Sequence, residues 1–134
     1  MATVFTKIID GEIPSVKIHE DDRCIVILDI SPINKGHALV IAKAEYVTIT
    51  DCPDDELSHY MKVAKTVAAK MEEVLGIDGF NIMINNRPAS GQEVPHLHIH
   101  VIPRFKRDGK TPPLKKESYD DEQQMIEFGR RLSF

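Results

Sequence analysis

Tryptophan is absent from this chain of 134 residues, and cysteine occurs only twice. Cys24 and Cys52 are too few and too isolated for a disulfide framework or a thiolate zinc site, so we expect two reduced structural thiols. No apolar run approaches the roughly 18 residues of a membrane span, and the opening MATVFTKIIDGEIP lacks an apolar core followed by a cleavage pattern. We therefore expect a soluble, cytoplasmic protein with no membrane partner.

An excess of positive charge is also missing. The formal net charge is -4 and the pI is about 5.8. Binding to nucleic acid normally needs a basic surface that releases phosphate counterions, so we expect no nucleic-acid partner. The local basic run Arg104, Lys106, Arg107 and Lys110 is interpreted as a solvated loop. Length and composition are those of one ordinary domain, and we expect residues 1–134 to form it.

The apolar pattern predicts two adjacent strands and a long helix. CIVILD at 24–29 and HALVIAK at 37–43 are short, apolar runs rich in branched side chains, separated by the turn-rich SPINKG. Across 54–75 the apolar positions recur every three or four residues, which is typical of an amphipathic helix. Pro53 near its start and Gly76 after its end mark the boundaries.

Further elements complete an α+β chain. Strands are predicted near 80–85 and 96–102, joined by the loop NRPASGQEVP, and a short helix at 4–9. A weaker helical pattern lies near 121–131, and its predicted buried side is Met125, Ile126, Phe128 and Leu132. No repeat or linker is found. The fold class that we expect is α+β, an antiparallel sheet of about five strands with one long helix and shorter helices.

Three histidines alternate with apolar residues in HLHIHVIPR. His96, His98 and His100 are separated by Leu97 and Ile99, with Val101 next. Successive side chains on a strand point to opposite faces, so the apolar residues enter the core while the imidazoles form one row. The pattern therefore predicts three imidazoles on one surface.

Three interpretations of this row are open: exposed structural histidines, a metal site, or a catalytic site. Two histidines at alternate positions can share a zinc ion, but a strand advances about 13 Å from His96 to His100, too far for all three. Catalysis suits imidazole because an unperturbed pKa of about 6.5 leaves most of it neutral at pH 7. A neutral ring nitrogen is a nucleophile, and neighbouring imidazoles can donate hydrogen bonds to an anionic substrate, which favours phosphorus chemistry.

The run GQEVPHLHIHVIPR resembles the signature of the histidine triad (HIT) family, His-φ-His-φ-His-φ-φ with φ apolar. Three other blocks resemble the same family in the same order: TKIIDGEIPS, LDISPINKGHALVIAK around Asp29 and His37, and INN at 84–86. The similarity covers the chain from about Phe5 to Arg104. Four blocks in order are far more specific than the histidines alone.

The resemblance implies a HIT-like fold and a nucleotidyl hydrolase or transferase that cleaves a nucleoside monophosphate from an amine or phosphate leaving group. His98 would attack the α-phosphorus and carry the nucleotide covalently until water removes it. His96 and His100 would help to fix the phosphate, and His37 would support the row as a polar group. The resemblance also implies a homodimer, and the chemistry requires neither a cofactor nor a metal.

The resemblance also assigns substrate contacts for a purine nucleotide. Asp29 would bind the ribose hydroxyls, because a carboxylate accepts two hydrogen bonds from a vicinal diol. Asn85 would hold the ribose and phosphate, and Gln92 with the backbone of Gly91 and Val94 would shape the phosphate end. The candidates for an apolar base cleft are Phe5, Ile8, Ile18, Ile27 and Leu28.

The chain departs from the family pattern at three places. Many relatives carry a Cys-x-x-Cys pair near the N-terminus that helps to bind structural zinc, where this chain reads Thr3-Val4-Phe5-Thr6, so we expect no zinc there. Glu93 stands where a serine is usual in the subgroup most active on phosphoramidates, and Arg87 where glycine is common. We expect purine nucleoside phosphoramidate hydrolysis, with dinucleoside polyphosphate hydrolysis or a non-catalytic nucleotide-binding scaffold as alternatives.

Overall fold

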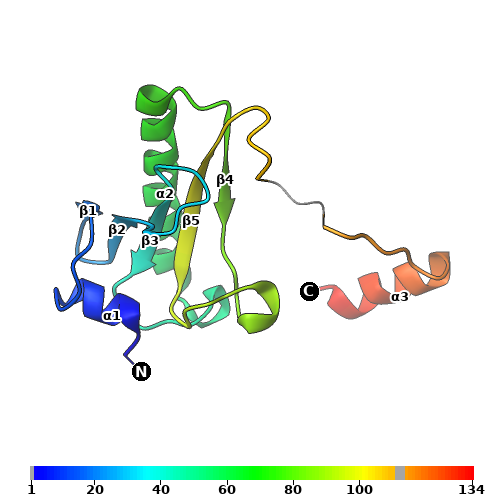
Figure 1. Cartoon of the computed structure of the whole chain (residues 1–134). Coiled ribbons are helices and arrows are strands. Elements are labelled where there is room, and N and C mark those ends of the chain that lie inside the picture. Colours follow the sequence, from blue (N-terminus) through cyan, green and yellow to red (C-terminus); the bar gives the residue numbers. More distant parts are fainter. Residues whose placement is uncertain (1, 111–113) are drawn as a thin grey trace.

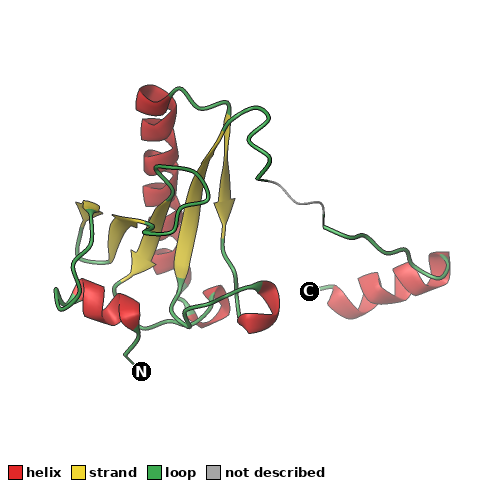
Figure 2. Cartoon of the chain, in the orientation of Figure 1, coloured by secondary structure: helices red, strands yellow, loops and turns green. Residues whose placement is uncertain are grey.

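The computed structural model describes residues 2–110 and 114–134. Five strands form one antiparallel sheet in the order β1-β2-β3-β5-β4. The strands are β1 (Lys17–Glu20), β2 (Cys24–Leu28), β3 (Ala38–Ala42), β4 (Gly79–Met83) and β5 (His98–Arg104). The helices are α1 (Val4–Ile9), α2 (Asp54–Leu75) and α3 (Glu122–Leu132), with short 3₁₀ turns at Ile49–Asp51 and Pro88–Ser90 (Figures 1 and 2). The predicted α+β class is confirmed.

Helix α2 lies along one face of the sheet and forms the larger core with it (Figure 1). Val26, Val40 and Ile99 from three neighbouring strands pack with Ala64 and Met71 of the helix, and all five are buried. Three acidic residues in the first turn favour the start of this helix electrostatically, and Gly76 ends it with a φ of 61°. Cys24 and Cys52 are both free and buried.

A second, smaller core covers the opposite face of the sheet. Phe5 of α1 packs there with Ile25, Ile27, Leu39 and Ile41. The alternation of side chains along each strand produces this division, because Ile25 and Ile27 point away from the face that carries Val26. The sheet is thus covered by α2 on one side and by the short α1 on the other.

Strand register fixes where the histidine row lies. His98 pairs with Ile41 and His100 with Leu39, so both imidazoles share the face of the smaller core, opposite α2. His96 precedes β5, and the backbone of Leu97 bonds instead to Tyr46 and Ala42. The row of three on one strand is therefore two strand residues preceded by a third histidine in the loop.

The expected burial of α3 is wrong, although the helix forms close to its predicted range. Its four apolar candidates are exposed: Met125 57%, Ile126 55%, Phe128 43% and Leu132 74%. Figure 1 shows α3 standing away from the sheet and α2. Helical periodicity reports an apolar stripe and does not report what covers it. Within the described ranges, no helix is both long and apolar enough to cross a bilayer.

Candidate active site

Side-chain and backbone contacts determine which nitrogen of His98 is free. The ring is only 7% exposed, and its Nδ1 lies 2.7 Å from the carbonyl oxygen of His96. A carbonyl only accepts, so Nδ1 carries the proton and donates it. No other hydrogen bond to this ring occurs among the described residues, which leaves the lone pair of Nε2 available.

A second hydrogen-bonded chain fixes the tautomer of His100. The backbone N–H of Ile33 donates to Nδ1 of His37 over 3.1 Å, so the proton of a neutral His37 is on Nε2. That Nε2–H donates to Nδ1 of His100 over 2.9 Å, which places the proton of neutral His100 on its Nε2. The rings of His98 and His100 are 4.9 Å apart between centroids. The site therefore presents a lone pair beside an N–H donor.

Burial keeps these imidazoles uncharged near neutral pH. Desolvation lowers the pKa of His98, an effect that the hydrogen bond to the carbonyl of His96 opposes. Desolvation, with smaller contributions from His98 and His37, lowers the pKa of His100 to about 4. Desolvation also lowers the pKa of His37, against the attraction of Asp29. At pH 7 the nucleophilic form of His98 therefore predominates.

The structure places His96, an expected phosphate contact, out of reach of solvent. Its ring is 1% exposed and both nitrogens are engaged. Nε2–H donates to the carbonyl of Ala42 over 2.6 Å, and Nδ1 accepts from the hydroxyl of Thr3 over 3.2 Å. The His96 ring lies edge-on to Phe5 at 5.8 Å between centroids, on the face of the sheet that also carries His98. His96 is a positioning residue that anchors the carbonyl to which His98 donates.

Thr3 is a supporting residue that the sequence analysis did not assign. Its side chain caps α1 and bonds His96, and the side chain of Thr6 in the same turn donates to Glu45. In the sequence, only one feature pointed to Thr3. Thr3 and Thr6 stand at the two positions where many relatives carry the Cys-x-x-Cys pair. These hydroxyls supply hydrogen bonds rather than the thiolates that a structural zinc site of that kind uses.

The loop before β5 is held by its own side chains. Oε1 of Gln92 accepts from the backbone of Arg87 over 2.8 Å, and its Nε2 donates to the carbonyl of Val47 over 2.7 Å. Asn85 donates to the carbonyl of Gly91 over 3.5 Å. Val94 packs against the smaller core, on the face of the histidines. Gln92 thus orders the loop with its whole amide group.

Asp29 lies beside the histidine pair. Its Oδ1 accepts from the backbone of Ser31, and its Oδ2 lies 3.8 Å from Nε2 of His37, with the side chain 22% exposed. Ligand atoms of Asp29, His37 and His100 all lie within 4.8 Å of one another, a spacing that could also hold a metal ion. In the structure that space is used by the bond between the two imidazoles.

Only part of the expected base cleft is brought to the histidines. The ring of Phe5 meets the ring of His98 edge-on at 4.8 Å, and Ile8 and Ile27 pack with Phe5. Leu28 packs with the larger core, and Leu28 and Ile18 both line a groove beside α2. Strand alternation sends Leu28 to the face opposite Ile27, so the structure places Leu28 and Ile18 away from Phe5 and the histidine row.

Comparisons with known proteins agree with this geometry. A family model described as the HIT domain matches residues 10–107. An uncharacterized HIT-like protein of Methanocaldococcus jannaschii is 46% identical over 108 residues, covering 81% of this chain and 83% of that protein. A crystal structure of a HIT family member from Bacillus subtilis superposes with a TM-score of 0.88 at 30% identity, covering 98% of this chain and 95% of that one.

Two further relatives carry names of enzymes. Adenosine 5'-monophosphoramidase HNT1 of Saccharomyces cerevisiae is 42% identical over 110 residues, 82% of this chain and 66% of the yeast protein. Adenylylsulfatase HINT3 of Arabidopsis thaliana is 41% identical over 105 residues, 78% of this chain. The match spans 53% of the Arabidopsis protein, about half of its length.

Arg87 offers a test of the loop geometry. Its φ of 74° and ψ of 157° fall in a region that is essentially restricted to glycine, at a cost of about 1–3 kcal/mol for other residues. Arg87→Gly should raise the free energy of unfolding by about 1 kcal/mol, since relief of strain exceeds the added entropy of an unfolded glycine, about 0.5–1 kcal/mol. Urea denaturation measures the change. Arg87→Ala, which keeps Cβ, is the control, and an Arg87→Gly protein less stable than it would contradict the strain.

Proposed function

This chain belongs to the HIT family, and we propose that it is a hydrolase that cleaves purine nucleoside phosphoramidates through a nucleotidyl-His98 intermediate. The hydrolase class is supported by the enzymes among its relatives. The observation that carries the proposal is the lone pair on Nε2 of buried His98 beside the N–H of His100. A binding scaffold alone has no need for a nucleophile poised in this way.

In the first step, Nε2 of His98 attacks the α-phosphorus, a P–N bond forms and the bond from phosphorus to the leaving amine breaks. The departing nitrogen takes up a proton from solvent, while the Nε2–H of neutral His100 stays in place and donates a hydrogen bond to the phosphate. Substitution on Nε2 makes the His98 ring cationic. The carbonyl of His96 then accepts a charge-assisted hydrogen bond from Nδ1, which is stronger than in the neutral ring.

In the second step, water attacks the same phosphorus, the P–N bond to His98 breaks, and the nucleoside monophosphate leaves. The attacking water releases its proton to solvent, which balances the proton taken up by the leaving amine in the first step. In this proposal Asp29 binds the ribose hydroxyls, Phe5, Ile8 and Ile27 hold the base, and the loop ordered by Gln92 holds the phosphate. Asn85 and Gly91 lie together at that end.

The preference for a phosphoramidate over a dinucleoside polyphosphate rests on the yeast relative, whose name is adenosine 5'-monophosphoramidase. Both substrate classes would share the phosphorus centre and the intermediate and differ only in the leaving group. Measuring kcat/KM on adenosine 5'-phosphoramidate and on diadenosine polyphosphate decides between them. A higher value on the polyphosphate would overturn the proposed substrate while leaving the intermediate in place.

His98 is tested by trapping and substitution. Protein quenched during turnover should carry an added nucleoside monophosphate on the peptide that contains His98, seen by mass spectrometry. His98→Ala should lose kcat by about 10⁴-fold or more, as removal of a nucleophile does in other enzymes, while nucleotide affinity stays within about tenfold. His19→Ala, on the other face of the sheet, is the control and should keep its turnover. An active His98→Ala protein would refute the assignment.

The pH dependence follows from the direction of the pKa shifts. Protonation of Nε2 removes the lone pair of His98. Because the pKa of His98 is lowered, this protonation occurs at pH values below the ordinary histidine pKa of about 6.5. With a substrate that keeps one negative charge, kcat/KM should fall on the acid side with a midpoint below about 6.5. An acid limb with its midpoint at or above about 6.5 would show that burial does not tune this ring.

We also propose a homodimer that uses β4. This strand is an edge of the sheet, and its apolar Phe80 and Ile82 are 40% and 37% exposed. An open apolar edge is a ready surface for pairing with another chain. Light scattering after size-exclusion chromatography should give the mass of a dimer, and Ile82→Lys should halve it. Val16→Lys, at a residue 63% exposed near the opposite edge, should remain dimeric. A monomeric unmodified chain would refute this proposal.

A further inference from the structure

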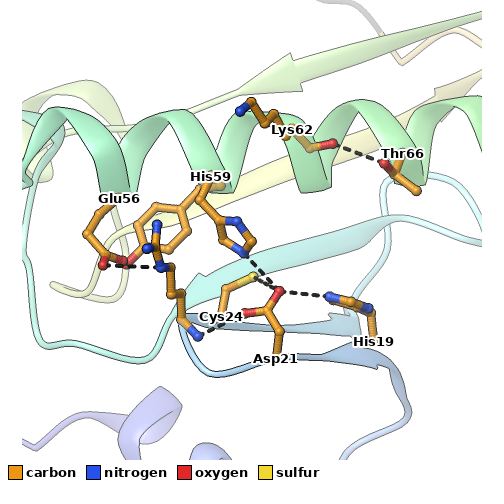
Figure 3. A network of polar contacts seen from close by, with 9 residues as sticks. His19, Asp21, Cys24, Glu56, His59, Lys62 and Thr66 are labelled. Carbon is orange, nitrogen blue, oxygen red and sulfur yellow. Dashed lines mark hydrogen bonds and ion pairs between the residues drawn. The ribbon is translucent and has the colours of Figure 1, made fainter.

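A second cluster of chemically active side chains lies where β1, β2 and α2 meet (Figure 3). We propose that His19, Asp21, Cys24 and His59 form a binding site for a divalent transition-metal cation of the zinc class, which fastens the β1–β2 hairpin to α2. The proposed reaction uses none of these four residues.

The four side chains converge on one atom. Oδ2 of Asp21 lies 2.9 Å from Nε2 of His19 and 2.8 Å from Nε2 of His59. Sγ of Cys24 lies 3.6 Å from the same oxygen, and the ligand atoms of His19, Asp21 and Cys24 are all within 4.8 Å of one another. Tetrahedral zinc with bonds of about 2.0–2.3 Å separates its ligand atoms by about 3.3–3.8 Å. The ligand atoms of His19, Asp21 and Cys24 come close to this spacing, and His59 joins them through Oδ2 of Asp21.

The carboxylate is oriented in advance by its own turn. Oδ1 of Asp21 accepts the backbone N–H groups of Arg23 and Cys24 over 2.8 and 2.9 Å. This leaves Oδ2 directed at the two imidazoles, as Figure 3 shows. Metal ligands held in this way by a second layer of hydrogen bonds bind more tightly than free side chains.

The donor set and its charge suit a zinc-class ion. Two imidazoles, one carboxylate and one thiolate are the nitrogen, oxygen and sulfur ligands that tetrahedral zinc takes. The carboxylate and thiolate neutralise a divalent cation, and Cys24 releases its proton to solvent when it coordinates. The side chains of His19, His59 and Asp21 are 45%, 29% and 23% exposed, so an ion can enter, with buried Cys24 beneath them.

The site is separate from the histidine row. His19 pairs with Val26, which faces α2, whereas His98 and His100 lie on the opposite face of the sheet. His59 comes from α2, 38 residues away from Asp21 in the chain. The ion would therefore join two segments distant in sequence and would act on stability rather than on the reaction.

Cobalt(II) titration of the full chain, freed of metal by chelation, tests this site. We expect one bound ion with the absorption of tetrahedral cobalt and a sulfur-to-metal charge-transfer band, both abolished when zinc displaces it. His19→Gln and His59→Gln should each weaken binding by at least about 100-fold, the upper end of what loss of a supporting second-layer group costs. Cys24→Ser should lose the charge-transfer band, and Cys52→Ser should keep it.

Thermal unfolding gives a readout of metal binding that depends neither on the cobalt absorption bands nor on catalytic activity. Zinc should raise the Tm of the unmodified chain and leave that of His59→Gln unchanged, with the far-ultraviolet circular dichroism of the variant confirming its fold. Absence of cobalt binding would overturn the proposal. So would binding that survives both histidine substitutions and is lost in His100→Asn, because the ion would then belong to Asp29, His37 and His100.

Discussion

The hydrogen bond from Nδ1 of His98 to the carbonyl of His96 decides which nitrogen of the central histidine can react. It depends on the position of that carbonyl, which depends in turn on the buried ring of His96 bonded to Ala42 and Thr3. The same bond holds the imidazole in place when the ring becomes cationic. One short contact thereby links the N-terminal helix, the neighbouring strand and the nucleophile.

The two faces of the sheet have different roles: one carries most of the core, and the other carries the reactive histidines. On the α2 face, Val26, Val40 and Ile99 build most of the core and supply rigidity. On the other face the short α1 and its Phe5 leave His98 and His100 at the border of the smaller core, where burial is sufficient to keep the rings neutral. Because β5 is rigid, it holds His98 and His100 in a defined geometry. Because their face of the sheet is covered only by the short α1, a substrate can reach them.

The sequence predicted the sheet, the long helix and the histidine cluster because each is encoded locally. The alternation around His98 and His100 and the three-four spacing of 54–75 both survive folding. The hydrogen bonds that engage both ring nitrogens of His96 were not predictable, because their partners, Thr3 and Ala42, lie far away in the chain. The expected burial of Met125 failed, and Leu28 lies on the face opposite Ile27, for a related reason: apolarity indicates that a residue prefers burial and does not identify the face or the partner that provides it.

The central claim is that the nucleotidyl group is transferred twice, first to His98 and then to water. Hydrolysis in ¹⁸O-labelled water of a nucleotide substrate whose α-phosphorus is a chiral phosphorothioate measures the number of displacements directly. Two in-line displacements predict net retention of configuration at phosphorus. Net inversion would mean that water attacks the substrate in a single step, and the free lone pair of His98 would then not be the nucleophile.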